Sequence, residues 1–279
     1  MTVRELCALV GMSKQNFYKE KHVRQRRAVD ETLIVDLVLA ERRQQPALGT
    51  RKLQVVLRRE LEEAGVSIGR DRLFKVLRHH DLLIERRRRS GPRTTDSRHG
   101  FRVYGNLLKA LELQGPHEAW VSDLTYIRTQ EGFLYLALVM DAWSRKIVGW
   151  HVGATLEALG CLAAVRMAIA QLPADAKPIH HSDRGTQYCC NDYVALVASR
   201  KLPISMTEVN HCYENAKAER LNGILKGEYG LGEDFARKSE VESVVRQAVT
   251  LYNECRPHTS LGYRMPSAVH KEGRRQAAA

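Results

Sequence analysis

The chain has 279 residues, of which 44% are hydrophobic and 27% are charged. This length and composition suit one catalytic domain with a smaller module, and they exclude a chain that is disordered throughout. No signal-peptide pattern opens the sequence and no apolar run is long enough to cross a bilayer, so we expect a soluble, cytoplasmic protein.

The net charge of +12 is concentrated in the first 100 residues, which hold 23 Lys and Arg against 13 Asp and Glu. The rest of the chain holds 21 against 19. A cationic part joined to a nearly neutral one predicts that the N-terminal part binds a polyanion. A basic surface that serves only solubility is the ordinary alternative, but it explains poorly the uninterrupted run Arg86, Arg87, Arg88 and Arg89.

The cysteines and the paired histidines give no sign of a metal-binding module. Six cysteines are scattered without a C-x-x-C pair, which fits a reducing compartment. The adjacent pairs His79/His80 and His180/His181 lack the two spaced ligand pairs of a zinc site. We expect these histidines to be ordinary core or surface residues.

Residues 1–84 predict an all-α region of the helix-turn-helix kind. The opening reads as two short helices joined at Gly11, and a third amphipathic helix starts at Asp30. Two more helices follow over residues 50–65 and 67–83. The last of these helices has a basic face opposite its apolar face. We expect Arg70, Arg72 and Lys75 of that basic face to contact DNA phosphates, as we do the arginine run 86–89.

Residues 85–115 are expected to form a basic linker and connecting segment, because their first half lacks hydrophobic periodicity and contains Gly and Pro. Apolar or alternating stretches then predict three adjacent strands within residues 119–153. Helices and short strands follow, so residues 116–270 predict a mixed α/β sheet with flanking helices. Residues 271–279 are expected to be a flexible tail.

Three acidic residues of this region stand where a catalytic metal site is expected. Asp123 lies inside the first apolar strand, where an unpaired carboxylate is costly and a metal ion would compensate it. Asp183 directly follows a short strand, at the carboxyl end where open sheets bind ligands. Glu219 lies on a helix that can pack against the sheet.

The helix over residues 214–229 has one polar face. Asn215, Glu219, Asn222 and Lys226 are spaced by four, three and four residues, and the remaining positions are largely apolar. We expect this face to point Glu219 toward the strand carboxylates and to bring Lys226 beside a substrate phosphate. Asn215 and Asn222 are further candidates for DNA contact.

Three carboxylates suit Mg²⁺ or Mn²⁺, and two such ions about 4 Å apart can activate an attacking oxygen and stabilise a leaving one. Phosphodiester transfer is the chemistry that this arrangement serves. Surface Asp and Glu are usually only solvated, so the hypothesis depends on position and spacing. Asp141 is the rival ligand, although it fits a turn-capping role before Ser144 and Arg145 equally well.

The motifs around these residues resemble a known family. The 35 residues between Asp183 and Glu219 resemble the D,D-35-E signature of retroviral integrases and many insertion-sequence transposases. Residues 118–268 are similar to the OrfB catalytic subunit of the insertion-sequence-3 family. The strings that carry this similarity, in order, are WVSDLTYI, LVMDAWSRKIVGW, HSDRGTQY, CYENAKAERLNGILKGE and YNECRPHTSLGYRMP.

The resemblance implies a ribonuclease-H-like core in which Asp123, Asp183 and Glu219 bind the metal ions and Lys226 is a basic residue near them. It also implies double-stranded DNA as the partner, both as element ends and as target, and a homo-oligomer assembled on that DNA in the bacterial nucleoid. The family further implies an upstream helix-turn-helix protein as a frameshift fusion partner.

Three functions are compatible with the sequence. The first is a transposase that cleaves a strand and joins its 3′-hydroxyl to another duplex. The second is a non-catalytic DNA-binding regulator or domesticated relic, which the intact acidic triad disfavours. The third is a ribonuclease-H-like nuclease that cleaves without joining, and the helix-turn-helix region and the segment RPHTSLGYRMP favour recognition of element ends instead.

A fragment of about residues 1–100 should bind duplex DNA with a strong salt dependence, whereas residues 101–279 should bind weakly, because the positive charge lies in the first fragment. If roughly six phosphates are neutralised, log affinity should fall with log salt at a slope near about −5. Fluorescence anisotropy at several salt concentrations measures both fragments. A flat salt response, or equally tight binding by the second fragment, would contradict the prediction.

Overall fold

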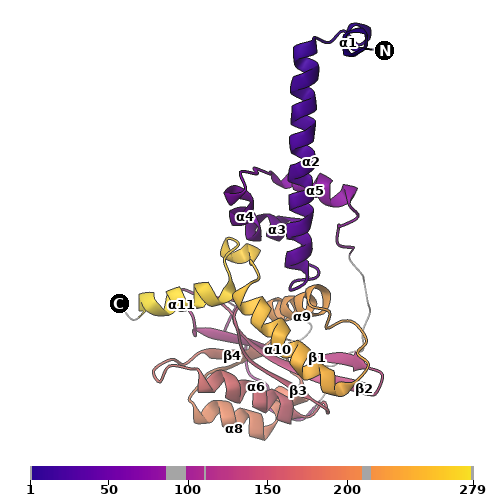
Figure 1. The fold of residues 1–279 in the computed structure, drawn as a ribbon. Coiled ribbons are helices and arrows are strands. Elements are labelled where there is room, and N and C mark those ends of the chain that lie inside the picture. The colour runs from indigo at the N-terminus through magenta and orange to yellow at the C-terminus, as the bar shows by residue number, and fades with distance from the viewer. Residues whose placement is uncertain (1, 86–98, 110, 209–214, 278–279) are drawn as a thin grey trace. The chain divides into compact units, whose positions relative to one another are not determined.

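The computed structural model describes residues 2–85, 99–109, 111–208 and 215–277. The chain divides into two compact units, Met1–Glu85 and Arg86–Ala279, which are described separately here. Figure 1 shows that the first unit is helical and that the second contains the sheet. No described helix is both long and apolar enough to cross a membrane. The five described cysteines are free thiols.

The first unit is built from helices packed around a small apolar core. The helices are α1 (Val3–Leu9), α2 (Lys14–Arg42), α3 (Thr50–Val56), α4 (Arg58–Glu63) and α5 (Arg70–His79). Ile34 and Val38 of α2 are fully buried against Leu53 of α3 and against Leu73 and Leu77 of α5. The apolar stripe of α5 therefore faces inward and its basic residues face outward, as its periodicity predicted.

Two helix boundaries in this unit differ from the sequence-based expectation. The short helix after Gly11 and the helix expected from Asp30 form one element, α2, because no Gly or Pro interrupts the chain between them. The single helix expected over residues 50–65 is instead divided into α3 and α4. The division falls at Leu57, whose backbone angles of φ −84° and ψ 0° leave the helical region.

The second unit contains a five-stranded mixed sheet. The strands are β1 (Ala119–Thr129), β2 (Gly132–Asp141), β3 (Ile147–Gly153), β4 (Ile179–Ser182) and β5 (Ile204–Met206). Their order in the sheet is β3-β2-β1-β4-β5. The first three strands pair antiparallel, and β4 pairs parallel with both β1 and β5. This is the ribonuclease-H-like arrangement that the sequence predicted, and β1 lies at its centre.

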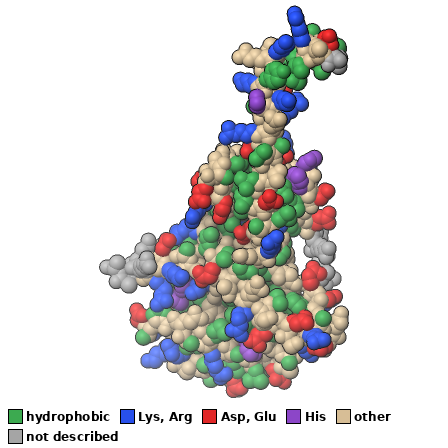
Figure 2. Space-filling model, viewed as in Figure 1, with side chains coloured by type: hydrophobic (Ala, Val, Ile, Leu, Met, Phe, Trp, Pro, Cys, Tyr) green, Lys and Arg blue, Asp and Glu red, His purple; other side chains and the backbone are tan. Residues whose placement is uncertain are grey.

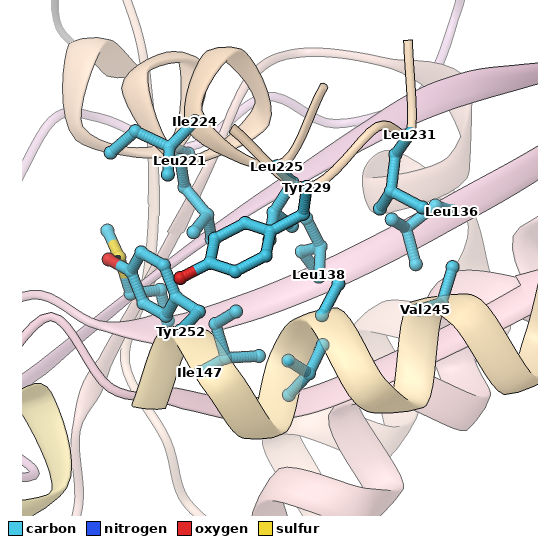
Figure 3. Close-up of a cluster of buried hydrophobic side chains, with 14 of the residues drawn as sticks. Leu136, Leu138, Ile147, Leu221, Ile224, Leu225, Tyr229, Leu231, Val245 and Tyr252 are labelled. Atoms are coloured by element: carbon cyan, nitrogen blue, oxygen red, sulfur yellow. Dashed lines mark hydrogen bonds between the residues drawn. The ribbon is translucent and has the colours of Figure 1, made fainter. Parts of the chain in front are cut away.

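Helices cover both faces of the sheet. They are α6 (Ala158–Ala170), α7 (Thr186–Cys189), α8 (Asn191–Ser199), α9 (Ala216–Glu228), α10 (Lys238–Glu254) and α11 (Pro266–Ala277). One core joins the sheet to α9 and α10 through Leu138, Leu221 and Val245, and Figure 3 shows these side chains pointing toward one another. A second core joins the other face to α6 and α8 through Val165 and Val197.

The C-terminal helix α11 corrects one expectation. Residues 271–277 were expected to be part of a flexible tail, but they belong to α11. Gly273 explains the docking of this helix, because a Cβ atom there would lie 2.6 Å from the Trp143 ring and 2.7 Å from Pro116. The helix therefore packs directly on the turn between β2 and β3, a contact that local sequence patterns do not reveal.

Gly149→Ala should destabilise the second unit, because a Cβ atom at this β3 position would overlap the backbone carbonyl of Ala164 on α6. We expect the free energy of unfolding to fall by about 1–3 kcal/mol. Gly227→Ala on α9 is the matched control: a Cβ atom meets nothing within 4 Å there, and the helix should gain about 0.5–1 kcal/mol.

Tryptophan fluorescence during urea denaturation measures this change selectively, because Trp120, Trp143 and Trp150 all lie in the second unit. If both alanine variants unfold at the midpoint of the parent protein, the contact between β3 and α6 is looser than described.

Candidate active site

Asp123 occupies the middle of the central strand. Side chains alternate along a strand, so Asp123 points to the same face as Val121 and Ile127, which pack in the core beneath α9 and α10. The carboxylate is half-buried. Its Oδ1 accepts a hydrogen bond from the Leu124 N–H at 2.9 Å, and its Oδ2 accepts one from Asn222 Nδ2 at 2.7 Å.

Asp183 lies next to Asp123 because of strand register. Val121 of β1 pairs with His181 of β4 in parallel, and each aspartate follows its strand's paired residue by two positions. Asp183 Oδ1 accepts a hydrogen bond from the Gly185 N–H at 3.0 Å. A Cβ atom at Gly185 would lie 3.1 Å from the same oxygen, so the turn that orients Asp183 leaves little room for a side chain.

Glu219 lies in the first turn of α9 and is exposed. The pKa of Asp123 is raised to about 7, chiefly because of its burial, then because of the negative charge of Asp183, and least because of Glu219. Glu219 is therefore within electrostatic range of Asp123. Among the described residues, however, no group of three His, Cys, Asp or Glu side chains is arranged to hold a metal ion. The structure thus brings the two aspartates together and leaves the three-carboxylate cluster a prediction.

Asn215 and Asn222 attach α9 to the central strand. Both side chains are buried, and both donate to β1: Asn215 Nδ2 to the Ser122 carbonyl at 3.0 Å, and Asn222 Nδ2 to Asp123. The polar face of the helix is therefore directed at the strand, as the spacing of its residues predicted. Their expected contact with DNA stays a prediction, since in the described structure these amides are used inside the protein.

Lys226 lies two turns beyond Glu219 and is half-buried. Its ammonium group lies 3.9 Å from the centre of the Tyr126 ring, in cation–π contact. Burial lowers the pKa of Lys226, and the nearby Asp123 carboxylate opposes that shift. Lys226 is therefore within electrostatic range of Asp123, as the helical periodicity indicated.

Asp141 does not belong to this site. It is fully buried, and its pairing partner on β1 is Trp120, three residues before Asp123. One carboxylate oxygen accepts from the His117 N–H at 2.7 Å, and the other accepts from the Ser144 N–H and hydroxyl at 2.8 Å. These bonds show that Asp141 caps the turn, and both of its carboxylate oxygens are occupied within the protein.

Sequence reasoning missed a buried network behind the site. The hydroxyl groups of Ser122 and Tyr193 lie 2.9 and 3.0 Å from His180 Nε2. Burial lowers the pKa of His180 to about 4, so the ring is neutral near pH 7. His181 Nδ1 lies 2.8 Å from the Ser205 hydroxyl. Both histidines are core residues, as expected, and the alternation of β4 was the only signal in the sequence that could have assigned them to opposite faces.

The three basic residues of the first unit that we expect to contact DNA all lie on α5. Arg70 forms an ion pair with its neighbour Asp71 at 2.8 Å, and Arg72 lies 3.7 Å from Asp30 of α2. Lys75 is exposed and lines a surface groove of about 420 Å³, which basic residues dominate. The groove is lined by Arg27, Glu31, Arg72, Lys75, Val76 and His79. The residues Arg86 to Arg89 lie outside the described part of the chain.

Comparison with known proteins decides the family. The integrase core domain matches residues 114–212 and, in a second form, residues 200–266. The "Insertion element IS600 uncharacterized 31 kDa protein" of Shigella sonnei is 35% identical over 98% of this chain and 100% of its own length. The chain belongs to the insertion-sequence-3 family of transposases. Its relative "Transposase InsF for insertion sequence IS3A" of Escherichia coli strain K12 is 34% identical over 73% of this chain and 71% of its own.

Two solved structures with some likeness to this transposase-family chain contain viral integrases. The catalytic core domain of HTLV-2 integrase, solved in complex with magnesium, gives a TM-score of 0.44 at 16% identity, over 56% of this chain and 97% of that one. A simian T-cell lymphotropic virus intasome in complex with the PP2A regulatory subunit B56 gamma gives 0.48 at 15% identity, over 80% of this chain and 70% of that one.

The residues of the site fit a divalent metal ion. Asp123 and Asp183 supply hard oxygen donors, which are the ligands that Mg²⁺ and Mn²⁺ prefer. Burial and mutual repulsion make the charged form of Asp123 costly, and a bound cation would remove that cost. Asn222 and the Leu124 N–H fix the orientation of the Asp123 carboxylate, as ligand-orienting groups do in metal sites.

Asp123→Asn should stabilise the metal-free protein at alkaline pH. Because the pKa of Asp123 is raised to about 7 in the folded state, folding favours its protonated form. The parent protein therefore loses stability as the pH rises from the pKa of Asp123 in the unfolded chain to its pKa of about 7 in the folded protein, and the variant does not. With chelator present, we expect the variant to gain on the order of 2 kcal/mol relative to the parent between pH 5 and pH 8.

Thermal unfolding at a series of pH values measures this difference. Added Mg²⁺ provides the control, since it should stabilise the parent at pH 8 and have less effect on the variant. If the stability of the two proteins changes with pH in the same way, ionisation of Asp123 does not destabilise the fold.

Proposed function

We propose that this chain is a DNA transposase that cleaves a strand at the ends of its insertion sequence and joins the exposed 3′-hydroxyl to another duplex. Membership of the insertion-sequence-3 family supports this reaction. The observation that carries it is the adjacent pair Asp123 and Asp183. The parallel register of β1 and β4 brings them together, and the negative charge of Asp183 helps to raise the pKa of Asp123.

Asp123, Asp183 and Glu219 are the proposed ligands of Mg²⁺ or Mn²⁺, with two ions as the expected number. When bound, such ions polarise a phosphate and lower the pKa of an attacking hydroxyl. The position of Glu219 on α9 supports the assignment, since Asn215 and Asn222 attach the helix to β1 on either side of it. In the proposed metal-bound form, the exposed Glu219 side chain turns toward the two aspartates.

The other residues of the site have proposed roles in orientation and in substrate binding. Asn222 holds one oxygen of Asp123 and leaves that carboxylate with a fixed direction. Lys226 presents its ammonium near the aspartates, where a phosphate of the DNA end would offset the negative charge. In the first unit, Arg70, Arg72 and Lys75 are proposed to contact the DNA backbone.

The partners follow from the reaction. A transposase acts on double-stranded DNA, as element end and as target, and pairing of two ends requires more than one copy of the chain, so we propose a homo-oligomer assembled on DNA. The site of action is then the bacterial nucleoid. The upstream helix-turn-helix protein, joined by frameshifting, is proposed as a fusion partner on family grounds alone.

Asp183→Asn and Glu219→Gln should each abolish strand cleavage and strand transfer in the full chain, because each removes a negative metal ligand while keeping the side-chain size. The expected loss is at least about a hundredfold, comparable to the loss of other essential charge-stabilising groups. Labelled element ends incubated with Mg²⁺, with products resolved on a denaturing gel, measure both steps.

Asp192→Asn provides the matched control, since it removes one exposed acid from α8 of the same unit and should retain activity. End binding in the absence of metal should be unchanged in all three variants. Full activity of Asp183→Asn would remove Asp183 from the site. Binding of element ends by the parent protein without any cleavage would favour a regulator instead.

A further inference from the structure

Basic side chains from three segments that are distant in the sequence gather on the second unit. Arg145 and Lys146 come from the turn between β2 and β3, Lys217 from the first turn of α9, and Lys271 and Arg274 from α11. We call these five residues the turn–α11 cluster. Figure 2 shows Lys and Arg side chains gathered with a histidine in the region of α11.

The members of the cluster are close enough to affect one another's charge. Burial lowers the pKa of Lys146, and the positive charges of Lys271 and Arg274 lower it further, against an opposing effect of Glu254. Like charges from the turn and from α11 thus meet, an arrangement that costs free energy in the isolated protein.

Two acids, Glu254 and Asp141, act electrostatically on Lys146 of the cluster without forming an ion pair with it among the described residues. Among the described residues, none of its five members forms an ion pair within 4 Å. Asp141 is the buried acid of the turn, and its oxygens accept from His117 and Ser144. Glu254 accepts from the Ser267 hydroxyl at 2.6 Å. Glu272 on α11 is paired with Arg264.

The fold holds the cluster in place. Gly273 packs against Trp143 and Pro116, and it lies between Lys271 and Arg274 in the sequence. This close approach brings both cations to the turn that carries Lys146. Beneath them, burial lowers the pKa of His270 to about 3, so this ring is neutral near pH 7 and the positive charge lies on the surface side chains.

We propose that the turn–α11 cluster is a second DNA-binding surface, which contacts the phosphate backbone of a duplex beside the catalytic site. Five cations spread over three segments suit a polyanion that presents many charges in a row, whereas a single small anion would meet only two or three of them. Lys217 connects the surface to the site, since it lies on the same helix as Glu219. The inference rests on the proposed function for the identity of the polyanion.

Lysine acetylation of the full chain, read by mass spectrometry without metal, tests the contact directly. Duplex DNA should slow the acetylation of the exposed Lys217 and Lys271 several-fold and leave the equally exposed Lys177 and Lys201 unchanged. The experiment uses two duplexes, one with the element end and one of unrelated sequence. Protection by the element end alone assigns the surface to end binding, and protection by both assigns it to target or backbone binding.

A charge-matched pair of variants tests the energetic contribution. The triple variant Lys146→Gln, Lys271→Gln and Arg274→Gln should flatten the slope of log affinity against log salt by about 2–3, as expected for three lost phosphate contacts. The control removes the same charge elsewhere on this unit, through Arg166→Gln, Lys177→Gln and Arg200→Gln, and should leave the slope unchanged.

Unprotected Lys217 and Lys271, together with equal slopes for the two triple variants, would overturn the proposal, and binding of an acidic protein in place of DNA would do so as well. Neither measurement requires strand cleavage. Inactive triad variants should therefore still show the protection, so a failure of the catalytic assignment and a failure of the DNA surface give different results.

Discussion

The central position of β1 is the constraint on which the rest of the second unit depends. This strand pairs with β2 along ten residues on one edge and with β4 on the other, and each of its faces is covered by a separate apolar core. A side chain on β1 can therefore reach water only where a helix leaves room. Asp123 lies at such a point, half-buried beneath α9, and this explains both the cost of its charge and its suitability for a cation.

Helix α9 packs on this strand and brings Glu219 toward the aspartates. Its apolar side chains, such as Leu221 and Leu225, pack in the core that Figure 3 shows, and its two asparagines donate to β1. Hydrophobic packing is not directional, whereas these two hydrogen bonds require one register. Glu219 lies between the asparagines, so the same bonds that fix the helix determine where the third acid can reach.

Opposite charges are concentrated at different places within the second unit. The aspartates concentrate negative charge in the middle of β1 and directly after β4, and the turn–α11 cluster concentrates positive charge beside the start of α9. Each concentration is unfavourable by itself. A metal ion would relieve the first and a phosphate backbone the second, which is the general reason that functional surfaces are often less stable than the scaffold that holds them.

The sequence by itself determined what depends on local pattern. The alternation of Val121 and Asp123 predicted a strand with a carboxylate in it, and the spacing of Asn215, Glu219 and Asn222 predicted one polar helix face. Long-range partners were beyond its reach. It could not show that both asparagines donate to β1, because the partner atoms lie about 100 residues away in the chain and are defined only when α9 packs.

Tertiary contacts also decided the role of Asp141 and the end of the chain. The sequence left Asp141 between metal binding and turn capping, and the N–H group of His117, 24 residues away, settled its role by occupying a carboxylate oxygen. The sequence predicted a tail over residues 271–277, but these residues belong to α11. The helix docks through the close approach of Gly273 to Trp143, a contact that the local sequence does not show. Periodicity records which face of an element is apolar, and packing alone decides what that face meets.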